Sequence, residues 1–428
     1  MKLLKSWWST PPNNFYWWIL FIALLLRLLW ALAAVPIVPV SDCNAYDTFA
    51  QNLANGYGYG WTSTELTAHW PPGTSFVYSI FYRWFGHTYV PIIILNLVLG
   101  IVIIWCSMQL AERWFNQQVA WLTGLLLTLW PVTIQFTTVL SSELLFTTLL
   151  LIALVIWLNE STHLWLRALL VGLVLAAACY VRSATLFIPL LLLLFRWVNT
   201  KEILRSIAAI MVVFMIMFLL IAPWSIRNTR LYDQFVLMSV NTGVAMWIGN
   251  NPKTVHGGHM NVPPELKEKM VGMNLAQRSA YLKALAIDYI KQEPLKFVTR
   301  SFKKLLRLHM RDTIGVAWNE KGLVYRYGTG VLLPLKIVSE GYWLVMLGLA
   351  LMGIILLGKQ QGWLTMIVHP VVVIWGYFAF GHAVTEIDDR YHFYSIPMIA
   401  ILAALMIAYG LKITAQRKQL SAEVTISQ

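Results

Sequence analysis

The sequence predicts an all-α protein that crosses a membrane several times, and three observations lead to this fold class. Of its 428 residues, 58% are hydrophobic and only 12% are charged, whereas soluble domains carry about a quarter charged residues. The mean hydropathy is +0.64. The apolar residues gather in runs of about 20 or more, the length of helix that crosses the hydrocarbon core of a bilayer. This excludes a soluble enzyme and a disordered regulator, and three cysteines cannot build a disulfide-stapled domain.

The apolar runs predict ten membrane-spanning helices. The first, Phe15–Val40, is broken only by Arg27 and is too long for a cleaved signal peptide. Val119–Leu158 contains a single charge, Glu143, and we expect two helices that meet near Thr137–Ser142. The other predicted spans are Tyr89–Leu110, one or two within Ala168–Phe195, Ile207–Trp224, Tyr342–Leu357, Trp363–Phe380 and Phe393–Leu411.

The basic residues indicate the orientation, because short cytoplasmic loops accumulate Lys and Arg. A turn at Arg182-Ser183 divides Ala168–Phe195 into two spans and gives a total of ten. This count places most short-loop basic residues on the cytoplasmic side: Lys2, Lys5, Arg196, Lys201, Arg205, Lys359, Lys412, Arg417 and Lys418. A single tilted helix would move those after Arg182 outside. We therefore expect both termini in the cytoplasm.

Three regions follow from this topology. Residues 1–222 form a transmembrane bundle that includes an outer loop, 41–87; residues 223–340 form a long outer loop region; residues 341–428 form the last spans and a cytoplasmic tail. The long region holds 17 Lys and Arg against 8 Asp and Glu. Within it, Leu282–Leu308 interleaves basic and apolar residues and predicts an amphipathic helix on the membrane surface. Membrane lipids are thus expected partners, and nucleic acid is not.

Two acids stand where chemistry could occur. Asp42 precedes a short predicted helix, Thr48–Asn55, with Tyr46 and Asp47 beside it. Its carboxylate would either cap that helix or act on a substrate. Glu143 stands at the outer end of the fourth span, where a helix N-terminus stabilises a carboxylate. It is a cap or a second acid facing the same cavity.

Arginines recur at the same outer level. Arg182, Arg227 and Arg390 either snorkel toward headgroups or converge on an anion, for which arginine is well suited. Arg27 lies deep in the first span, where partners inside the bundle are the default explanation and a functional site the alternative. Other candidate contacts are His69, before a Trp-Pro-Pro-Gly turn, and the amides of Asn228, Asn250 and Asn251.

No set of His, Asp and Glu residues has convincing metal-ligand spacing. His256 and His259 are close in sequence but stand beside two glycines. We therefore expect no required cofactor, with a divalent metal as the alternative.

Several segments in order form a known pattern. Asp42 and Tyr46 precede Ala50–Tyr59; Pro-Pro-Gly, Ser142-Glu143 and Arg182-Ser183 follow. The most specific pieces come next: Pro-Trp-Ser-Ile-Arg-Asn at 223–228 and Trp-Ile-Gly-Asn-Asn-Pro at 247–252. A late Arg-Tyr, at 390–391, follows them. Over nearly its whole length the chain resembles bacterial glycosyltransferase family 39-like proteins of the GT-C superfamily. Relatives include the lipid A aminoarabinose transferases and the protein O-mannosyltransferases.

The resemblance implies a GT-C-like helical bundle in the bacterial inner membrane, with a periplasmic active site and a polyprenyl-phosphate sugar donor. It implies Asp42 as general base and Glu143 as the second acid. The expected substrate contacts are Tyr46, Asp47, His69, Arg182, Arg227, Asn228, Asn250, Asn251, Arg390 and Tyr391. One departure matters, because Asp42-Cys43 replaces the Asp-Glu pair of the O-mannosyltransferases. The expected acceptor is therefore a hydroxyl of a lipid or envelope glycan rather than a protein.

Other classes stay open at this point. A polymerase or ligase of O-antigen would use a diphosphate-linked oligosaccharide. A transporter or flippase of lipid-linked sugars usually places ionisable groups at the bilayer midplane in two matching halves; here only Arg27 is deep and no halves match. A non-catalytic scaffold would leave the outer acids and arginines unexplained.

Overall fold

The structure is a computed structural model that describes residues 15–252 and 262–426. Lys2, Lys5, His256 and His259 lie outside the described residues. Every named element in the described part is helical, apart from one isolated bridge between Gly60 and Leu66. The predicted all-α membrane fold is confirmed.

Among the described residues, seven helical stretches are long and apolar enough to cross a membrane. They contain α2 (Phe15–Ala33), α5 (Val90–Trp114), α9 (Leu164–Val181), α10 (Ile188–Thr200), α11 (Ile203–Tyr232), α17 (Leu332–Gln361) and α20 (Ile396–Ile426). The pair α6 (Gln117–Leu129) and α7 (Pro131–Gln135), bent by 59°, would be an eighth. Two further apolar helices, α8 (Glu143–Trp157) and α19 (Pro370–Val384), have 15 residues each. Each of the ten predicted spans thus contains a helix, with one helix before Arg182 and one after it. Not all of these helices are long enough to cross a membrane alone.

Arg27 is fully buried, and the bend between α6 and α7 explains how. Its Nη2 donates to the Leu127 carbonyl and to Thr133 Oγ1, at 3.2 and 3.0 Å. Pro131 stands at the bend and lacks an N–H, so the Leu127 carbonyl loses its usual donor. Arg27 Nη1 donates to the Ala23 carbonyl of its own helix. These contacts give Arg27 the structural partners that were the default explanation.

Several expected boundaries are wrong. The first-loop helix α3 is Asp42–Ala54 rather than Thr48–Asn55. Its apolar face packs against the core of the protein, with Tyr46, Phe49 and Ala50 buried. This buried face favours helix formation from Asp42 onward, because packing outweighs local propensity.

The helices at both ends of the long outer region also differ in length from the expected spans. α11 runs through Pro223 to Tyr232, and α17 begins at Leu332, before Tyr342. The expected helix over Leu282–Leu308 is two helices, α14 (Leu275–Gln292) and α15 (Pro294–Leu308), because Pro294 interrupts the helical hydrogen bonds. An apolar run in the sequence predicts which part of a helix can be buried. It does not predict the residue at which the helical hydrogen bonds end.

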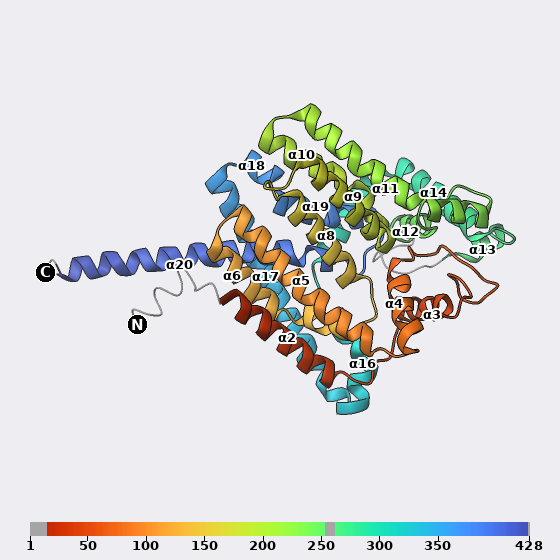
Figure 1. The fold of residues 1–428 in the computed structure, drawn as a ribbon, viewed down its shortest axis with the longest axis horizontal. Helices are drawn as coiled ribbons and strands as arrows, with labels where there is room; N and C mark the ends of the chain where they lie inside the picture. Colours follow the sequence, from red (N-terminus) through yellow and green to blue (C-terminus); the bar gives the residue numbers. More distant parts are fainter. Residues whose placement is uncertain (1–14, 253–261, 427–428) are drawn as a thin grey trace.

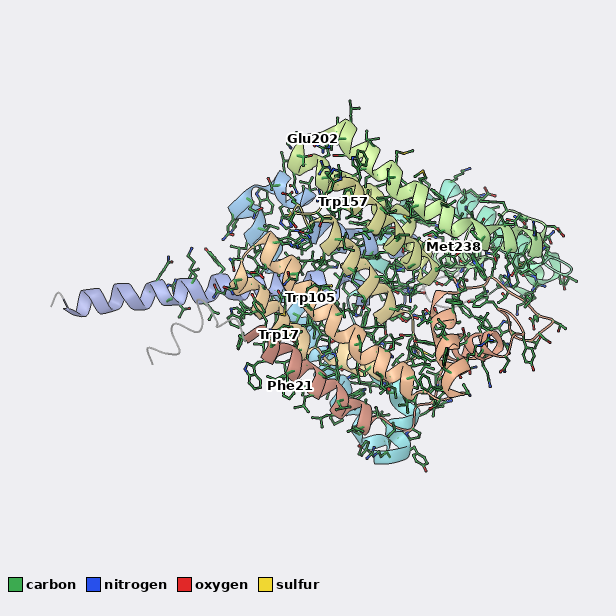
Figure 2. The ribbon with its side chains drawn as sticks, in the orientation of Figure 1. Trp17, Phe21, Trp105, Trp157, Glu202 and Met238 are labelled. Carbon is green, nitrogen blue, oxygen red and sulfur yellow. The ribbon has the colours of Figure 1, made fainter. Side chains whose placement is uncertain are left out.

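The helices outside the spans gather at one end of the bundle. Figure 1 shows α3, α4 (Gly73–Phe85), α12 (Asn241–Asn250), α13 (Pro264–Lys269) and α14 opposite α18 (Trp363–Val368) and the projecting part of α20. α2 begins near that second end, so the two described ends of the chain lie on the same side. Trp17 and Phe21 project from the outer face of α2 and are more than half exposed (Figure 2), as expected for side chains that contact lipid.

Candidate active site

A cavity of about 460 Å³ lies where α3, the start of α12 and the segment after α19 meet. Five of the lining residues are apolar or aromatic and are here called the apolar wall: Val181, Leu186, Phe187, Tyr377 and Phe378. Four further lining residues are polar and are here called the polar wall: Ser239, Asn241, Thr242 and Glu386. Asp42, Tyr46, Arg182, Arg390 and Tyr391 also line the cavity. Five of the twelve predicted site residues are therefore brought together here.

Asp42 pairs with Arg390 across the cavity. Arg390 Nη2 donates to Asp42 Oδ2 at 2.6 Å, and Arg390 Nε lies 3.3 Å from the half-exposed carboxylate of Asp388. Asp42 is the first residue of α3, and the N-cap position is Ser41, whose side chain makes no capping hydrogen bond. In the described part of the chain, Asp42 Oδ1 has no hydrogen-bond partner. The carboxylate therefore faces Arg390 and the cavity rather than capping the helix.

Glu143 contacts both cavity arginines without lining the cavity itself. It is the first residue of α8 and is fully buried, as the sequence predicts for an acid at this helix N-terminus. Its Oε1 accepts from Arg182 Nη2 at 2.6 Å and lies 3.9 Å from Arg390 Nε. Arg182 Nε also donates to Ser142 Oγ. Asp42, Arg390, Glu143 and Arg182 thus form a chain of alternating charge.

Tyr46 extends this cluster from α3. Its hydroxyl lies 3.5 Å from Ser142 Oγ, and burial raises the pKa of Tyr46 to about 12. The phenol is therefore neutral at physiological pH. The ring centroid of Trp70 lies 6.1 Å from that of Tyr46, and both residues line the cavity.

Asp47 does not line the cavity, although it is one helical turn from Asp42. Its carboxylate accepts hydrogen bonds from Tyr82 Oη at 2.5 Å and Tyr89 Oη at 3.1 Å, and lies 3.0 Å from His87 Nε2. All three partners lie on α4 or just before α5, so Asp47 joins the first loop to the bundle.

Arg227 and Asn228 are also placed away from the cavity. Arg227 Nη1 donates to the Thr67 carbonyl and to Asn228 Oδ1, and its Nη2 donates to the Tyr59 carbonyl. Its guanidinium also lies 4.7 Å from the ring of Trp224. Arg227 therefore does not converge with Arg182 and Arg390 in this structure; it fastens the end of α11 to the first loop.

The remaining predicted contacts lie around the cavity without lining it. Asn250 Nδ2 donates to the Val384 carbonyl, which ties the end of α12 to the end of α19. Asn251 Nδ2 donates to the Trp247 carbonyl within its own turn. The ring of His69 packs edge-on against Trp70, and burial lowers the pKa of His69.

The sequence analysis does not identify two further groups, Glu386 in the segment after α19 and His382 in the last turn of α19. Glu386 Oε1 accepts from Tyr391 Oη at 2.8 Å, and burial raises the pKa of Glu386. The His382 ring stacks on Tyr391 at 4.2 Å. A signal for them was available in the sequence. Glu386 lies within five residues of Arg390 and Tyr391, and His382 lies shortly before Glu386. The sequence analysis already places Arg390 at the outer level of the membrane.

The described residues contain no group of three or more His, Cys, Asp and Glu side chains that could hold a metal ion. Of the acids that line the cavity, Asp42 is paired with Arg390, and Glu386 accepts a hydrogen bond from Tyr391.

A bundle of apolar helices with a charged cavity at one end defines a multi-pass membrane protein. The same fold is found in the oligosaccharyltransferase of Archaeoglobus fulgidus. Its apo form superposes with a TM-score of 0.57 at 12% identity, over 97% of this chain and 53% of that one. The form tethered to an acceptor peptide containing an NVT sequon gives 0.56 at 12% identity, over 97% and 51%. The chain thus has the fold of the GT-C superfamily, and spans about half the length of those chains.

The sequence gives a second likeness. Residues 69–226 match the family described as dolichyl-phosphate-mannose-protein mannosyltransferase. ArnT from Cupriavidus metallidurans bound to undecaprenyl phosphate is a further similar structure, with a TM-score of 0.45 and 13% identity over 93% of this chain and 79% of that one. No curated protein matches the sequence. The resemblance to GT-C glycosyltransferases related to the mannosyltransferases is confirmed at the level of the superfamily.

Proposed function

We propose that the protein is a glycosyltransferase that moves a sugar from a polyprenyl-phosphate donor to a hydroxyl of a lipid or envelope glycan. The observation that carries this proposal is the cavity, which is lined by Asp42, Arg182 and Arg390 and in which one carboxylate oxygen of Asp42 has no partner among the described residues. The apolar wall and the polar wall line the same cavity.

The arginines suit the phosphate of such a donor. Arg182 and Arg390 each use Nη2 to bind an acid of the cluster, and no hydrogen bond engages either Nη1 in the described part of the chain. These groups would stabilise the negative charge that develops on a leaving phosphate, because positioned donors act strongly in a site that excludes water. The apolar wall supports binding of the polyprenyl chain, and its Phe187 is 61% exposed.

Asp42 is the proposed general base. The acceptor hydroxyl oxygen forms a bond to the anomeric carbon, and the bond from that carbon to the phosphate oxygen breaks. The hydroxyl proton passes to Asp42, and the bonding electron pair leaves with the polyprenyl phosphate. A single displacement inverts the anomeric configuration. The leaving phosphate ester is already a stable anion, so no strong general acid is needed.

The family matched over residues 69–226 is named for a dolichyl-phosphate sugar donor, which supports a polyprenyl-phosphate donor here. The predicted charge distribution supports a cytoplasmic location for both termini, and we propose that the loop end of the bundle, with the cavity, faces the periplasm of a bacterial inner membrane. Glu143 is proposed to hold the two arginines in position. No metal is proposed in the reaction.

Purified protein in detergent, given synthetic polyprenyl phosphates that carry radiolabelled monosaccharides, tests the proposal. We expect release or transfer of the sugar with formation of polyprenyl phosphate. Turnover of diphosphate-linked oligosaccharides alone would indicate a polymerase or ligase. Movement of intact donor across proteoliposomes without sugar release would indicate a flippase. Mass spectrometry of envelope glycans from a deletion strain then identifies the acceptor.

A further inference from the structure

The polar wall of the cavity has hydrogen-bonding groups that the protein does not use. In the described part of the chain, the side chains of Ser239, Asn241 and Thr242 make no hydrogen bond, although all three line the cavity. Glu386 uses one carboxyl oxygen to accept from Tyr391, and its Oε2 is likewise without a partner in the described structure. Four polar side chains thus have donors and acceptors that the described structure leaves free at the same cavity.

The wall is held in place by contacts behind it. Lys304 of α15 donates to the carbonyls of Thr385 and Gly249, at 2.7 and 3.1 Å, and Asn250 donates to the carbonyl of Val384 at 2.8 Å. Gly249 approaches Thr385 so closely that a Cβ would lie 1.8 Å from its carbonyl oxygen. The ends of α12 and α19 are therefore locked together, which fixes Glu386 relative to α12.

One wall of the cavity is apolar and the other can form hydrogen bonds. A lipid-linked sugar likewise has an apolar lipid chain at one end and a ring with hydroxyl groups at the other. A polyprenyl chain needs apolar contacts, a phosphate needs arginine, and a sugar ring needs groups that both donate to and accept from hydroxyls. Amide and hydroxyl side chains do both. A carboxyl group whose pKa is raised accepts when ionised and also donates when protonated. The arginines stand with Asp42 in the same cavity as both walls.

We infer that Ser239, Asn241, Thr242 and Glu386 form a subsite that binds the hydroxyl-bearing ring of the transferred sugar. This inference rests on the proposed function and adds to it the residues that recognise the sugar. Glu386 is the central member, because its position is fixed from both sides by Tyr391 and by the Lys304 contact to Thr385.

The test separates sugar recognition from lipid-phosphate binding. Two kinds of probe are compared on purified full-length protein: bare farnesyl phosphate, and a series of farnesyl phosphates carrying single pentoses or hexoses. Wild-type protein should bind at least one sugar-bearing probe more tightly than the bare one. Asn241→Ala and Glu386→Ala should each weaken that probe about tenfold, as expected for loss of a buried hydrogen bond, while bare farnesyl phosphate stays within about twofold.

Two further variants make the result specific. Arg390→Met should weaken both kinds of probe, because it removes a phosphate contact. Glu268→Gln, on the exposed face of α13, should change neither. Thermal unfolding of each variant shows whether it is folded, and Glu386→Gln, which keeps the shape of the side chain, replaces Glu386→Ala if that variant does not fold.

The inference is overturned if folded Asn241 and Glu386 variants lose affinity for both kinds of probe equally, or for neither. It is also overturned if wild-type protein binds bare and sugar-bearing probes with equal affinity, a result that leaves the lipid-phosphate site intact. Failure of wild-type protein to bind either kind of probe instead contradicts the proposed donor, and the subsite falls with it.

Discussion

Arg390 Nη2 lies 2.6 Å from Asp42 Oδ2, although 348 residues separate them in the chain. The pair closes the cavity between the first outer loop and the segment that follows α19. It leaves Asp42 Oδ1 and Arg390 Nη1 without partners in the described structure, one an acceptor and the other a donor. A proton acceptor and a cation thus lie side by side at one cavity. This arrangement suits the proposed reaction, in which a hydroxyl displaces a phosphate from the anomeric carbon of a sugar.

Replacing Asp42 by Asn should abolish transfer, because an amide cannot take the acceptor proton. We expect the turnover rate to fall by at least about a thousandfold, within the range that a general base contributes, while membrane insertion and thermal unfolding stay near wild type. Asp388→Asn is the matched control, since Asp388 also lies beside Arg390 at 3.3 Å but does not line the cavity. Near-normal turnover by folded Asp42→Asn protein would contradict the assignment of Asp42 as the general base.

Asp47 should behave differently from Asp42. Its carboxylate holds Tyr82, His87 and Tyr89, so Asp47→Ala leaves these partners without an acceptor. Removing the buried acceptor should cost about 2–4 kcal/mol of stability and lower the thermal midpoint in detergent. The turnover of the molecules that remain folded should stay within a few-fold of wild type. If Asp47→Ala kept its stability and lost turnover selectively, the structural role would be wrong.

These two acids show what the sequence could and could not predict. Both were found because a carboxylate after an apolar span is conspicuous, and hydropathy depends only on local composition. Which acid faces the cavity depends on the helix that carries them. Residues five apart on an α-helix point about 140° apart, and this relation was hidden while the helix was expected to begin at Thr48 rather than at Asp42.

The arginines teach the same point about tertiary structure. The sequence placed Arg182, Arg227 and Arg390 at one level of the membrane, which hydropathy can do. It could not show that Arg227 turns to the carbonyls of Thr67 and Tyr59, because these lie 160 and 168 residues away. Glu386 was missed for a related reason, since its role depends on how the ends of α12 and α19 meet.

The Glu143–Arg182 pair should be needed for folding as well as for chemistry. Glu143→Leu leaves the buried Arg182 without its closest charge, 2.6 Å away, and breaking a buried pair costs about 3–5 kcal/mol. The double variant Glu143→Leu with Arg182→Met removes both charges and should recover much of that stability without recovering transfer. Unfolding and turnover are measured on the four proteins of this cycle. Additive losses of stability would contradict a direct pair.

Chelation should leave transfer unaffected. The acids that the cavity presents are paired with arginines or with Tyr391, and no described cluster of His, Cys, Asp and Glu could hold a metal. We expect EDTA to change the turnover of purified protein by less than about twofold, where a required metal would cost orders of magnitude. Loss of turnover on chelation, restored by one divalent cation, would overturn this expectation.

Lys304 should make stability depend on pH. Burial, with a smaller effect of Arg300, lowers the pKa of Lys304 to about 7, whereas an unfolded lysine titrates near ~10.4. Between these values the unfolded chain binds a proton that the folded chain lacks, so stability rises with pH. Below about pH 7 both states are protonated and the slope disappears. The neutral amine still has two N–H groups for the carbonyls of Thr385 and Gly249.

Thermal unfolding in detergent between about pH 6 and 9.5 checks this expectation. The midpoint should rise with pH in wild-type protein and in Lys303→Met, which changes an exposed neighbour on the same helix. In Lys304→Met the rise should be smaller, because the titrating group is gone, whatever the variant loses in absolute stability through the missing hydrogen bonds. Since the comparison is between slopes, a general change in stability does not imitate it. An unchanged slope in Lys304→Met would show that another group titrates.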